Sequence, residues 1–600
     1  MKEKEIDLNL AVIGNCRTAA LVDGEARLLW WCFPRFDGDP IFCRLLADGE
    51  EKGFADVQLT ALADSSSSYL RNSPVLQTIL TDESGAQIRI TDFAPRFKNY
   101  ERVHRPPQLV RIIEPLSGFP QVKIRIRPCN DHGKPIRKQV SGSNHITYWG
   151  DKAVVRVTTD APLSFIESES AFALHKPLHL IFGPDEPVVG ELGPTCAELL
   201  TRTLHYWSGW VRGLSISYDW QDAIIRAAIT LKLSNFEETG GIVAAHTTSL
   251  PEAHGSGRNW DYRFCWLRDA YFVVKALSRI GATRTMEDFI SFILSIASIE
   301  NDNPLRPVYG ILPNENLHEW IAEELGGYRG NKPVRIGNAA ADQPQHDVYG
   351  SIILAAVPMF IDKRLPKPGD KDLFRFLEPI GEKAAQFALE PDAGIWEFRG
   401  RRNVHTYSAA MCWAGCNRLA MIARRLGLSE RAEYWTLRAD QIHEPLLAGA
   451  WNESRQAFTA SFGSDDLDAS CLLLAELGLV EPDDPRFVST VTAIERELMQ
   501  HHHHVMRYTT ADDFGLPETA FLVCRFWLID ALWSIGKKAR AKELFDDAIG
   551  HRNQFGLLSE DIDPKTGQLW GNFPQTYSMA GLILSAMRLS RTWEDRYWRG

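Results

Sequence analysis

The sequence predicts a fold in two parts, an antiparallel β-sandwich followed by a toroid of helical hairpins. Hydrophobic residues recur with a strand-like period of two up to about residue 195, and with a helix-like period from about residue 217. The chain has 600 residues, more than a single hydrophobic core usually holds. The predicted helices are separated by long loops rich in Trp, Asp, Glu, Arg and Gly, as expected where loops surround a cavity.

The N-terminal half contains short segments with strand character. Residues 75–80 and 88–91 flank Asp82-Glu-Ser-Gly85, which is typical of a β-hairpin. Residues 122–127 alternate apolar and charged side chains, as a half-buried strand does, and residues 153–157 continue this pattern. No helix-length periodicity interrupts it until roughly residue 195. We therefore expect a sandwich domain over residues 1–194.

The C-terminal half contains runs at helical spacing over residues 224–236, 269–280, 408–426 and 519–535. The last three runs are each followed by a glycine, Gly281, Gly427 and Gly536, in the position where a helix commonly ends. Pairs of such helices over about 380 residues would close into a toroid with a cavity at one end. We expect residues 195–216 to link the sandwich to this domain, which spans residues 217–600.

Composition and charge exclude several functional classes. The formal net charge is −11 and the isoelectric point is near 5.9, which argues against nucleic-acid or anionic-membrane binding, since both need a basic face. The first ten residues lack the apolar run of a signal peptide, and no uninterrupted apolar stretch would span a membrane. We expect a cytoplasmic protein.

Cysteine usage and the absence of phosphate motifs also predict that no metal or other cofactor is bound. The ten cysteines are scattered, several of them within apolar patterns, and we interpret them as buried reduced thiols. Cys412 and Cys416 lie four residues apart, but no second ligand pair accompanies them. We interpret His501–His504, Asp512-Asp513 and Asp465–Asp468 as solvated loop or helix-capping residues. Phosphate-binding glycine motifs are absent.

Three loops carry residues suited to catalysis. Arg258–Ala270 holds three arginines, two aspartates and two tryptophans just before a predicted helix, although Asp269 could equally be only the cap of that helix. Gly394–Gly400 places Glu397 beside Trp396, and apolar packing favours the protonated carboxyl that a general acid needs. Gly556–Pro564 contains Glu560, for which a simple turn or helix-entry role is an alternative.

Taken together in chain order, these motifs resemble family 15 of the glycoside hydrolases. The resemblance extends to Thr247–Glu252, Gly337–Ala340 and Leu557–Gln575, and to Ile13–Ala20 and Trp31–Asp37 near the N-terminus. It covers nearly the whole chain. It implies an N-terminal β-super-sandwich followed by a C-terminal (α/α)6 barrel, in agreement with the periodicity.

The resemblance also implies roles for individual residues. Glu397 matches the family's proton donor and Glu560 its catalytic base, while Arg268 and Asp269 match the pair that binds the terminal glucose hydroxyls. Arg507 resembles an arginine that clamps the same glucose. Further sugar contacts are expected from Trp266, Trp396 and Tyr577, the last of which replaces a tryptophan of the fungal members.

The expected activity is inverting, exo-acting hydrolysis of α-glucosides that releases β-glucose from the non-reducing end, as in glucoamylases. Such a pair of carboxyls should lie roughly 6.5–9.5 Å apart, with the attacking water between them. The substrate would be an α-linked gluco-oligosaccharide or disaccharide, and the chain could form a homo-oligomer. Phe398 stands where fungal glucoamylases have a second carboxylate, so starch specificity does not transfer.

Three alternatives remain open at this point. A trehalase would use the same acid and base with a different leaving-group subsite. An inverting phosphorylase would replace the base by a phosphate-binding cluster, against which the presence of Glu560 argues. A non-catalytic glucan-binding or regulatory protein would be expected to lack the acid or the base, whereas both positions hold glutamate here.

Overall fold

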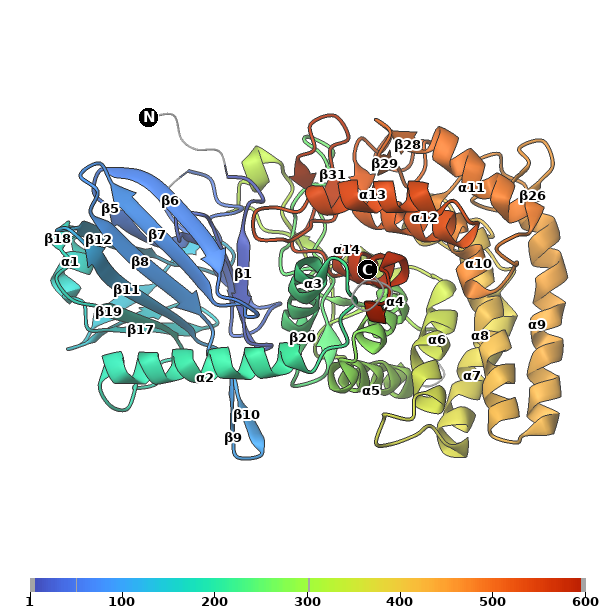
Figure 1. Cartoon of the computed structure of the whole chain (residues 1–600), viewed down its shortest axis with the longest axis horizontal. Coiled ribbons are helices and arrows are strands. Elements are labelled where there is room, and N and C mark those ends of the chain that lie inside the picture. Colours follow the sequence, from blue (N-terminus) through green and yellow to red (C-terminus); the bar gives the residue numbers. More distant parts are fainter. Residues whose placement is uncertain (1–5, 50, 301–302, 595–600) are drawn as a thin grey trace.

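The computed structural model describes residues 6–49, 51–300 and 303–594. In Figure 1 the N-terminal sheets lie at the left, in blue and cyan, and the C-terminal helices lie at the right, in green to red. Helix α2 (Leu192–Arg212) runs along the lower edge from the sheets towards the helices. This is the predicted order of a β-sandwich followed by a helical domain.

Two large antiparallel sheets form the sandwich. The first has the order β1-β2-β3-β5-β12-β18, with β4 paired to β3, and the second has the order β15-β16-β17-β19-β11-β8-β7-β6. The strands of the first sheet are β1 (Ala11–Gly14), β2 (Ala19–Val22), β3 (Leu28–Phe33), β4 (Asp39–Phe42), β5 (Phe54–Leu59), β12 (Gln121–Arg127) and β18 (Phe172–Ala173). Those of the second are β6 (Leu62–Tyr69), β7 (Leu76–Asp82), β8 (Gln87–Phe93), β11 (Leu109–Ser117), β15 (Lys138–Ser141), β16 (His145–Trp149), β17 (Val154–Thr159) and β19 (Leu178–Gly183). The two sheets contact each other through β1 with β8 and β5 with β7.

Local patterns in the sequence predicted several of these strands. The predicted hairpin is formed by β7 and β8, with Leu80 opposite Ile88. In β12 the side chains of Val122, Ile124 and Ile126 are buried and alternate with more exposed charged residues, because successive side chains point to opposite faces of a sheet. The predicted strand at residues 153–157 is β17.

Residues 195–216, which we expected to be a linker, lie mostly in helix α2. A short helix, α1 (Leu163–Glu167), also precedes the point at which helical periodicity was expected. Helix α2 packs against β19 and against β9 (Phe97–Asn99), which pairs with β10 (Arg102–His104) in a projecting hairpin. The domain bounds 1–194 and 217–600 stay predictions.

The helical half is a closed ring of six inner helices surrounded by six outer ones. The inner helices are α4 (Leu267–Arg279), α6 (Asp347–Ile361), α8 (Thr406–Arg425), α10 (Leu474–Leu477), α12 (Leu522–Ser534) and α14 (Thr576–Leu589). Each packs on the next, with the short helix at Ala469–Leu473 between α10 and α12, and α14 packs back on α4. The outer helices are α3 (Gln221–Leu233), α5 (Thr283–Glu300), α7 (Lys371–Phe387), α9 (Ser429–Ala450), α11 (Pro485–Glu497) and α13 (Lys538–Gly550). The structure thus has the predicted (α/α)6 arrangement.

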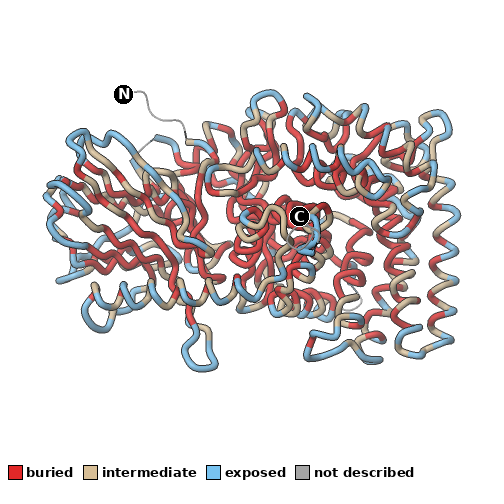
Figure 2. Tube along the Cα trace, in the orientation of Figure 1, coloured by how far each residue is buried: buried red, intermediate tan, exposed pale blue. Residues whose placement is uncertain are grey.

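Burial distinguishes the inner helices from the outer ones. In α8 every residue from Thr406 to Cys416 is buried, because the helix is covered by neighbours on all sides. In α9 the buried residues form a single stripe that includes Ala432, Trp435 and Ala439, and the opposite face is exposed. Figure 2 shows this contrast between the buried centre of the ring and α9 at its right edge.

The predicted helix ends are largely confirmed. Helices α4, α8 and α12 are followed by Gly281, Gly427 and Gly536, each with a positive φ that glycine adopts at low cost. One start is wrong. The helix expected from residue 519 begins at Leu522, because Ala520 and Phe521 form a short strand, β30, paired with β31 (Asp561–Ile562).

Contacts from the sandwich hold the loops that enter the ring. The Trp30 indole donates to the carbonyl oxygen of His246 at 2.8 Å, and Arg263 donates to that of Gly38 at 2.8 Å. Residues 246–263 lead directly into helix α4. The N-terminal half therefore fixes the position of a loop that belongs to the other half.

All ten cysteines are buried and free of disulfide bonds. Among the residues that the structure describes, no helix is long and apolar enough to cross a membrane.

The closest approach of two inner helices generates a stability prediction. A Cβ at Gly350 of α6 would collide with the carbonyl oxygen of Met411 in α8. We expect Gly350→Ala to destabilise the fold by about 3 kcal/mol, since the backbone oxygen has no room to move. Gly209→Ala in α2, where the added methyl would meet open space, should instead stabilise by about 0.5–1 kcal/mol. Thermal unfolding of both variants measures these changes in stability. Equal changes in the two variants would contradict the prediction.

Candidate active site

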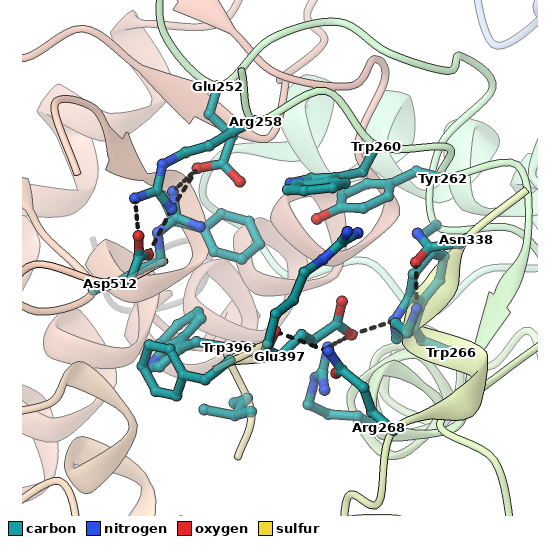
Figure 3. Close-up of a pocket in the computed structure, with 18 of the residues that line it drawn as sticks. Glu252, Arg258, Trp260, Tyr262, Trp266, Arg268, Asn338, Trp396, Glu397 and Asp512 are labelled. Atoms are coloured by element: carbon teal, nitrogen blue, oxygen red, sulfur yellow. Dashed lines mark hydrogen bonds and ion pairs between the residues drawn. The ribbon is translucent and has the colours of Figure 1, made fainter. Parts of the chain in front are cut away.

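A pocket opens among the loops at one end of the ring and encloses about 860 Å³, part of it open to solvent. Figure 3 shows Glu397 near its centre, with Arg268 and Trp266 beside it and Glu252, Arg258 and Asp512 across from them. Seven of the eight predicted site residues line it, namely Trp266, Arg268, Asp269, Trp396, Glu397, Arg507 and Tyr577. Glu560, the eighth, is buried behind this lining.

Glu397 projects into the pocket from the loop between α7 and α8. The Trp266 indole donates to its Oε1 at 2.7 Å, and Arg268 donates to the same oxygen at 3.2 Å. The side chain is 21% exposed, so a substrate can reach it. Its backbone has a φ of 61°, in the left-handed region that costs a non-glycine residue about 1 kcal/mol. The loop therefore holds this side chain in place at the expense of backbone strain.

Two glutamines support that position. Gln343 donates to the backbone carbonyl of Glu397 at 3.1 Å, and Gln345 donates to the side-chain oxygen of Gln343 at 3.2 Å. Arg268 completes the circuit, since it donates to Gln345 at 2.8 Å and to the Glu397 carboxylate. Gln345 is buried. The acid candidate and the arginine expected to bind glucose are thus parts of one hydrogen-bonded ring.

Asp269 lies in the first turn of α4 and lines the pocket. The alternative that it caps the helix is wrong, because the cap residue is Trp266 and no side chain caps this end. Burial raises the pKa of Asp269 to about 7, against the lowering effect of Arg268, while Glu397 and Asp347 raise it further. A buried carboxyl beside an arginine is suited to pair with neighbouring sugar hydroxyls.

Glu560 is not among the residues that line the pocket and is only 1% exposed. Its loop is fixed by the pairing of β30 with β31 and by the backbone N–H of Leu522, which donates to the Glu560 carbonyl at 2.9 Å. The N–H of Asn572 donates to Oε2 at 3.2 Å, whereas Oε1 has no hydrogen-bond partner among the described residues. A carboxylate oxygen without a partner is available to bind a water molecule.

Two further carboxylates surround this base candidate. One oxygen each of Glu252, Glu560 and Asp561 lies within 4.8 Å of the others. Burial raises the pKa of Glu560 well above its ordinary value, and the negative charges of Asp561 and Glu252 raise it further. Burial also raises the pKa of Asp561 to about 7. Glu560 and Asp561 therefore titrate as a pair rather than as independent acids.

Arg507 supplies the positive charge that this cluster needs. Its guanidinium forms an ion pair with Glu252 and lies 3.5 Å from Asp561. A metal ion could use the same three carboxylates, but two of them, Glu252 and Asp561, already contact the guanidinium. The arginine expected to clamp glucose is thus also the counter-ion of the base cluster.

Aromatic side chains form the walls. The Trp396 indole donates to Asp468 at 2.7 Å, which fixes its ring beside the pocket. Tyr577 is buried and its hydroxyl has no partner among the described residues. Tyr577 also lines a second hollow of about 760 Å³, so it separates the pocket from this more apolar space within the ring.

Several pocket residues escaped the sequence analysis. Arg258 pairs with Asp512 through two contacts of 2.7 and 2.5 Å, although Asp512 was interpreted as a solvated loop residue. Its neighbour Asp513 accepts from the backbone N–H groups of Arg399 and Gly400, which follow the acid loop. Glu252 and Arg258 stood at the edges of recognised motifs, which was the only signal for them.

By contrast, Asp468 does cap a short helix, as expected.

Comparisons with known proteins agree with this architecture. The sequence model of the glycosyl hydrolases family 15 matches residues 219–587. The chain belongs to this family. A second model, described as trehalase-like, N-terminal, matches residues 3–159. The resemblance inferred from the motifs is therefore confirmed.

Individual relatives extend over nearly the whole chain. A trehalase of Thermoplasma volcanium is 32% identical and covers 96% of this chain and 92% of its own length. A trehalase of Mycobacterium tuberculosis is 30% identical, with coverages of 98% and 90%. Among solved structures, a bacterial glucoamylase complexed with acarbose has a TM-score of 0.67 at 13% identity, covering 97% of this chain and 93% of its own. This last likeness confirms the fold class.

The glutamine ring generates a prediction. Gln345→Met keeps the volume of the side chain but removes the acceptor for Arg268 and the donor to Gln343. Loss of a hydrogen bond to a charged group costs about 1.5–3 kcal/mol, so kcat/KM on the preferred glucoside should fall roughly tenfold to hundredfold while the protein stays folded. Gln441→Met, on the exposed face of α9, is the matched control. Unchanged kinetics in Gln345→Met would show that the hydrogen bonds of Gln343 and Gln345 do not position Glu397.

Proposed function

We propose that the protein is an inverting trehalase in which Glu397 is the general acid and Glu560 the general base. The observation that carries this proposal is that Glu397 shares one pocket with Arg268, Asp269 and Arg507, and that Glu252, which also lines this pocket, belongs to a buried carboxylate cluster with Glu560 and Asp561. The glucoamylase-like activity expected from the sequence is the less favoured choice, since two relatives that are at least 30% identical over nearly the whole chain are named trehalases.

The proposed reaction follows from these positions. Glu397 gives its proton to the glycosidic oxygen as the bond from that oxygen to C1 of the terminal glucose breaks. Glu560 takes a proton from a water molecule, whose oxygen attacks C1 from the opposite face. Arg268 and Asp269 hold the hydroxyls of the reacting glucose, and the walls exclude other water. The carboxyl separation of roughly 6.5–9.5 Å stays a prediction.

The leaving-group side of the pocket supports a disaccharide substrate. Phe398 lines the pocket beside the acid and is stacked on His405, with ring centroids 5.7 Å apart. An apolar ring cannot replace the hydrogen bonds that a carboxylate at this position would make with a sugar.

The stereochemistry of the products tests this proposal. Hydrolysis of trehalose with inversion at one anomeric carbon should release equal amounts of β-glucose and α-glucose, because the leaving sugar keeps its own configuration. Proton NMR of the first products identifies the anomers released. Parallel assays on trehalose, maltose, isomaltose and panose measure which substrate is hydrolysed fastest. We expect Glu397→Gln to lose several orders of magnitude in turnover of trehalose. Release of α-glucose alone would indicate retention, and preference for maltose would restore the glucoamylase-like alternative.

The carboxylate cluster predicts a pH dependence. The base acts only when ionised, so kcat/KM should rise with pH through the raised pKa of Glu560, and the acid limb should lie above the ordinary range of glutamate. Asp561→Asn removes the negative neighbour that raises this pKa most after burial, so the acid limb should move to lower pH. Asp483→Asn, on the exposed surface, should leave the profile unchanged. An acid limb that stays in place or moves upward in Asp561→Asn contradicts the assignment of the base.

A further inference from the structure

A large cleft outside the catalytic pocket lies between the sandwich and the ring. It encloses about 2440 Å³ and is bounded by the β9–β10 hairpin, by α2, and by the turn between α4 and α5. In Figure 1 the hairpin projects below α2, and α5 lies to its right. None of the described residues that line the cleft also lines the catalytic pocket.

The cleft is basic although the chain is acidic. Seven lysine and arginine side chains line it against three carboxylates, whereas the whole chain carries a formal charge of −11. Four of the cations lie around its opening: Lys98, Arg102, Arg202 and Arg284. Three of these four residues, Lys98, Arg102 and Arg284, are exposed. A positive region of this kind in an acidic protein attracts anions by concentrating the local field.

The other three cations converge on one carboxylate. Arg96 donates to both oxygens of Glu237, at 2.6 and 2.8 Å, and the Lys232 ammonium donates to it at 2.8 Å. Arg105 lies 3.5 Å from the same carboxylate. Arg96 and Lys232 are almost fully buried. Asp288 adds a second negative charge near Lys232 and Arg105, so two carboxylates face three positive charges, two of which are shielded from water.

This arrangement leaves positive charge and donors unmatched. The buried Nε of Arg96 has no hydrogen-bond partner among the described residues, and the Nε of Arg105 lies 3.5 Å from Glu237 without a hydrogen bond to it. Excess charge in a partly desolvated position is unfavourable unless a counter-ion balances it. An anion bound between Arg105 and the cations at the opening would supply that balance.

We propose that this cleft binds a phosphate-bearing small molecule. A phosphate carries close to two negative charges and several acceptor oxygens, which match the planar donor groups of neighbouring arginines better than one carboxylate does. A polymeric nucleic acid is disfavoured, because the net negative charge of the rest of the surface would repel its backbone. The bound group would lie on cations contributed by both halves of the molecule.

Calorimetric titration with glucose 6-phosphate and with pyrophosphate tests the proposal. Glucose serves as the control without phosphate, and chloride at matched ionic strength serves as the control for unspecific anion binding. We expect saturable binding of the two phosphate compounds only. Arg105→Gln combined with Arg284→Gln should weaken it at least tenfold, as expected when charge-assisted contacts are lost. Basal turnover and thermal stability should not change, since both side chains lie outside the catalytic pocket.

Arg137→Gln combined with Arg375→Gln is the matched control, because both arginines are exposed, lie outside the cleft and change the net charge equally. Affinity in this variant should stay within about twofold of the original. Hydrogen exchange should show protection by the probe at residues 97–105 and 281–288. Absence of saturable binding, equal loss of affinity in both double variants, or protection of the catalytic loops instead would overturn the proposal.

Discussion

Closure of the inner ring is the constraint on which the rest of the structure depends. Apart from the short α10, each inner helix packs on neighbours on both sides and on an outer helix behind it, so its length, direction and contact residues are fixed together. Gly350 and Gly415 let α6 and α8 approach at the distance that closure requires. The loops at one end then converge, which brings Glu397 to the same pocket as Glu252, a neighbour of Glu560, from distant parts of the chain.

Charge balance imposes a second condition on the site. Glu252, Glu560 and Asp561 could not remain close together and buried without Arg507, which contacts two of them. The same arginine packs over Trp396 and Phe521, so its position is fixed by aromatic contacts as well as by ion pairs. The acid on the opposite side depends on a different cation, Arg268. Separate arginines thus balance the charge around the two carboxyls that we propose to react.

The sequence was most informative where function follows from short-range patterns. Periodicity predicted both halves of the fold, whereas the expected roles of Arg268, Glu397 and Glu560 came from the resemblance of the ordered motifs to a family, since the local composition of each loop left a structural role open. The ring of Gln343 and Gln345 and the pair of Arg258 with Asp512 could not be predicted in this way. Their partners lie 54 to 254 positions away in the sequence, so only the folded helical domain shows that these residues are in contact. The strand at Ala520–Phe521 was missed for the same reason, since its pairing partner is Asp561–Ile562.

The left-handed backbone of Glu397 has a consequence for the evolution of the protein. Glycine or asparagine would adopt this conformation with less strain, and either would relax the loop. Neither carries a carboxyl group that could donate a proton, so a gain in stability at this position would remove activity. Selection for thermal resistance alone would therefore favour replacing the residue, and selection for turnover would oppose it. Position 397 is thus one where the two pressures act in opposite directions.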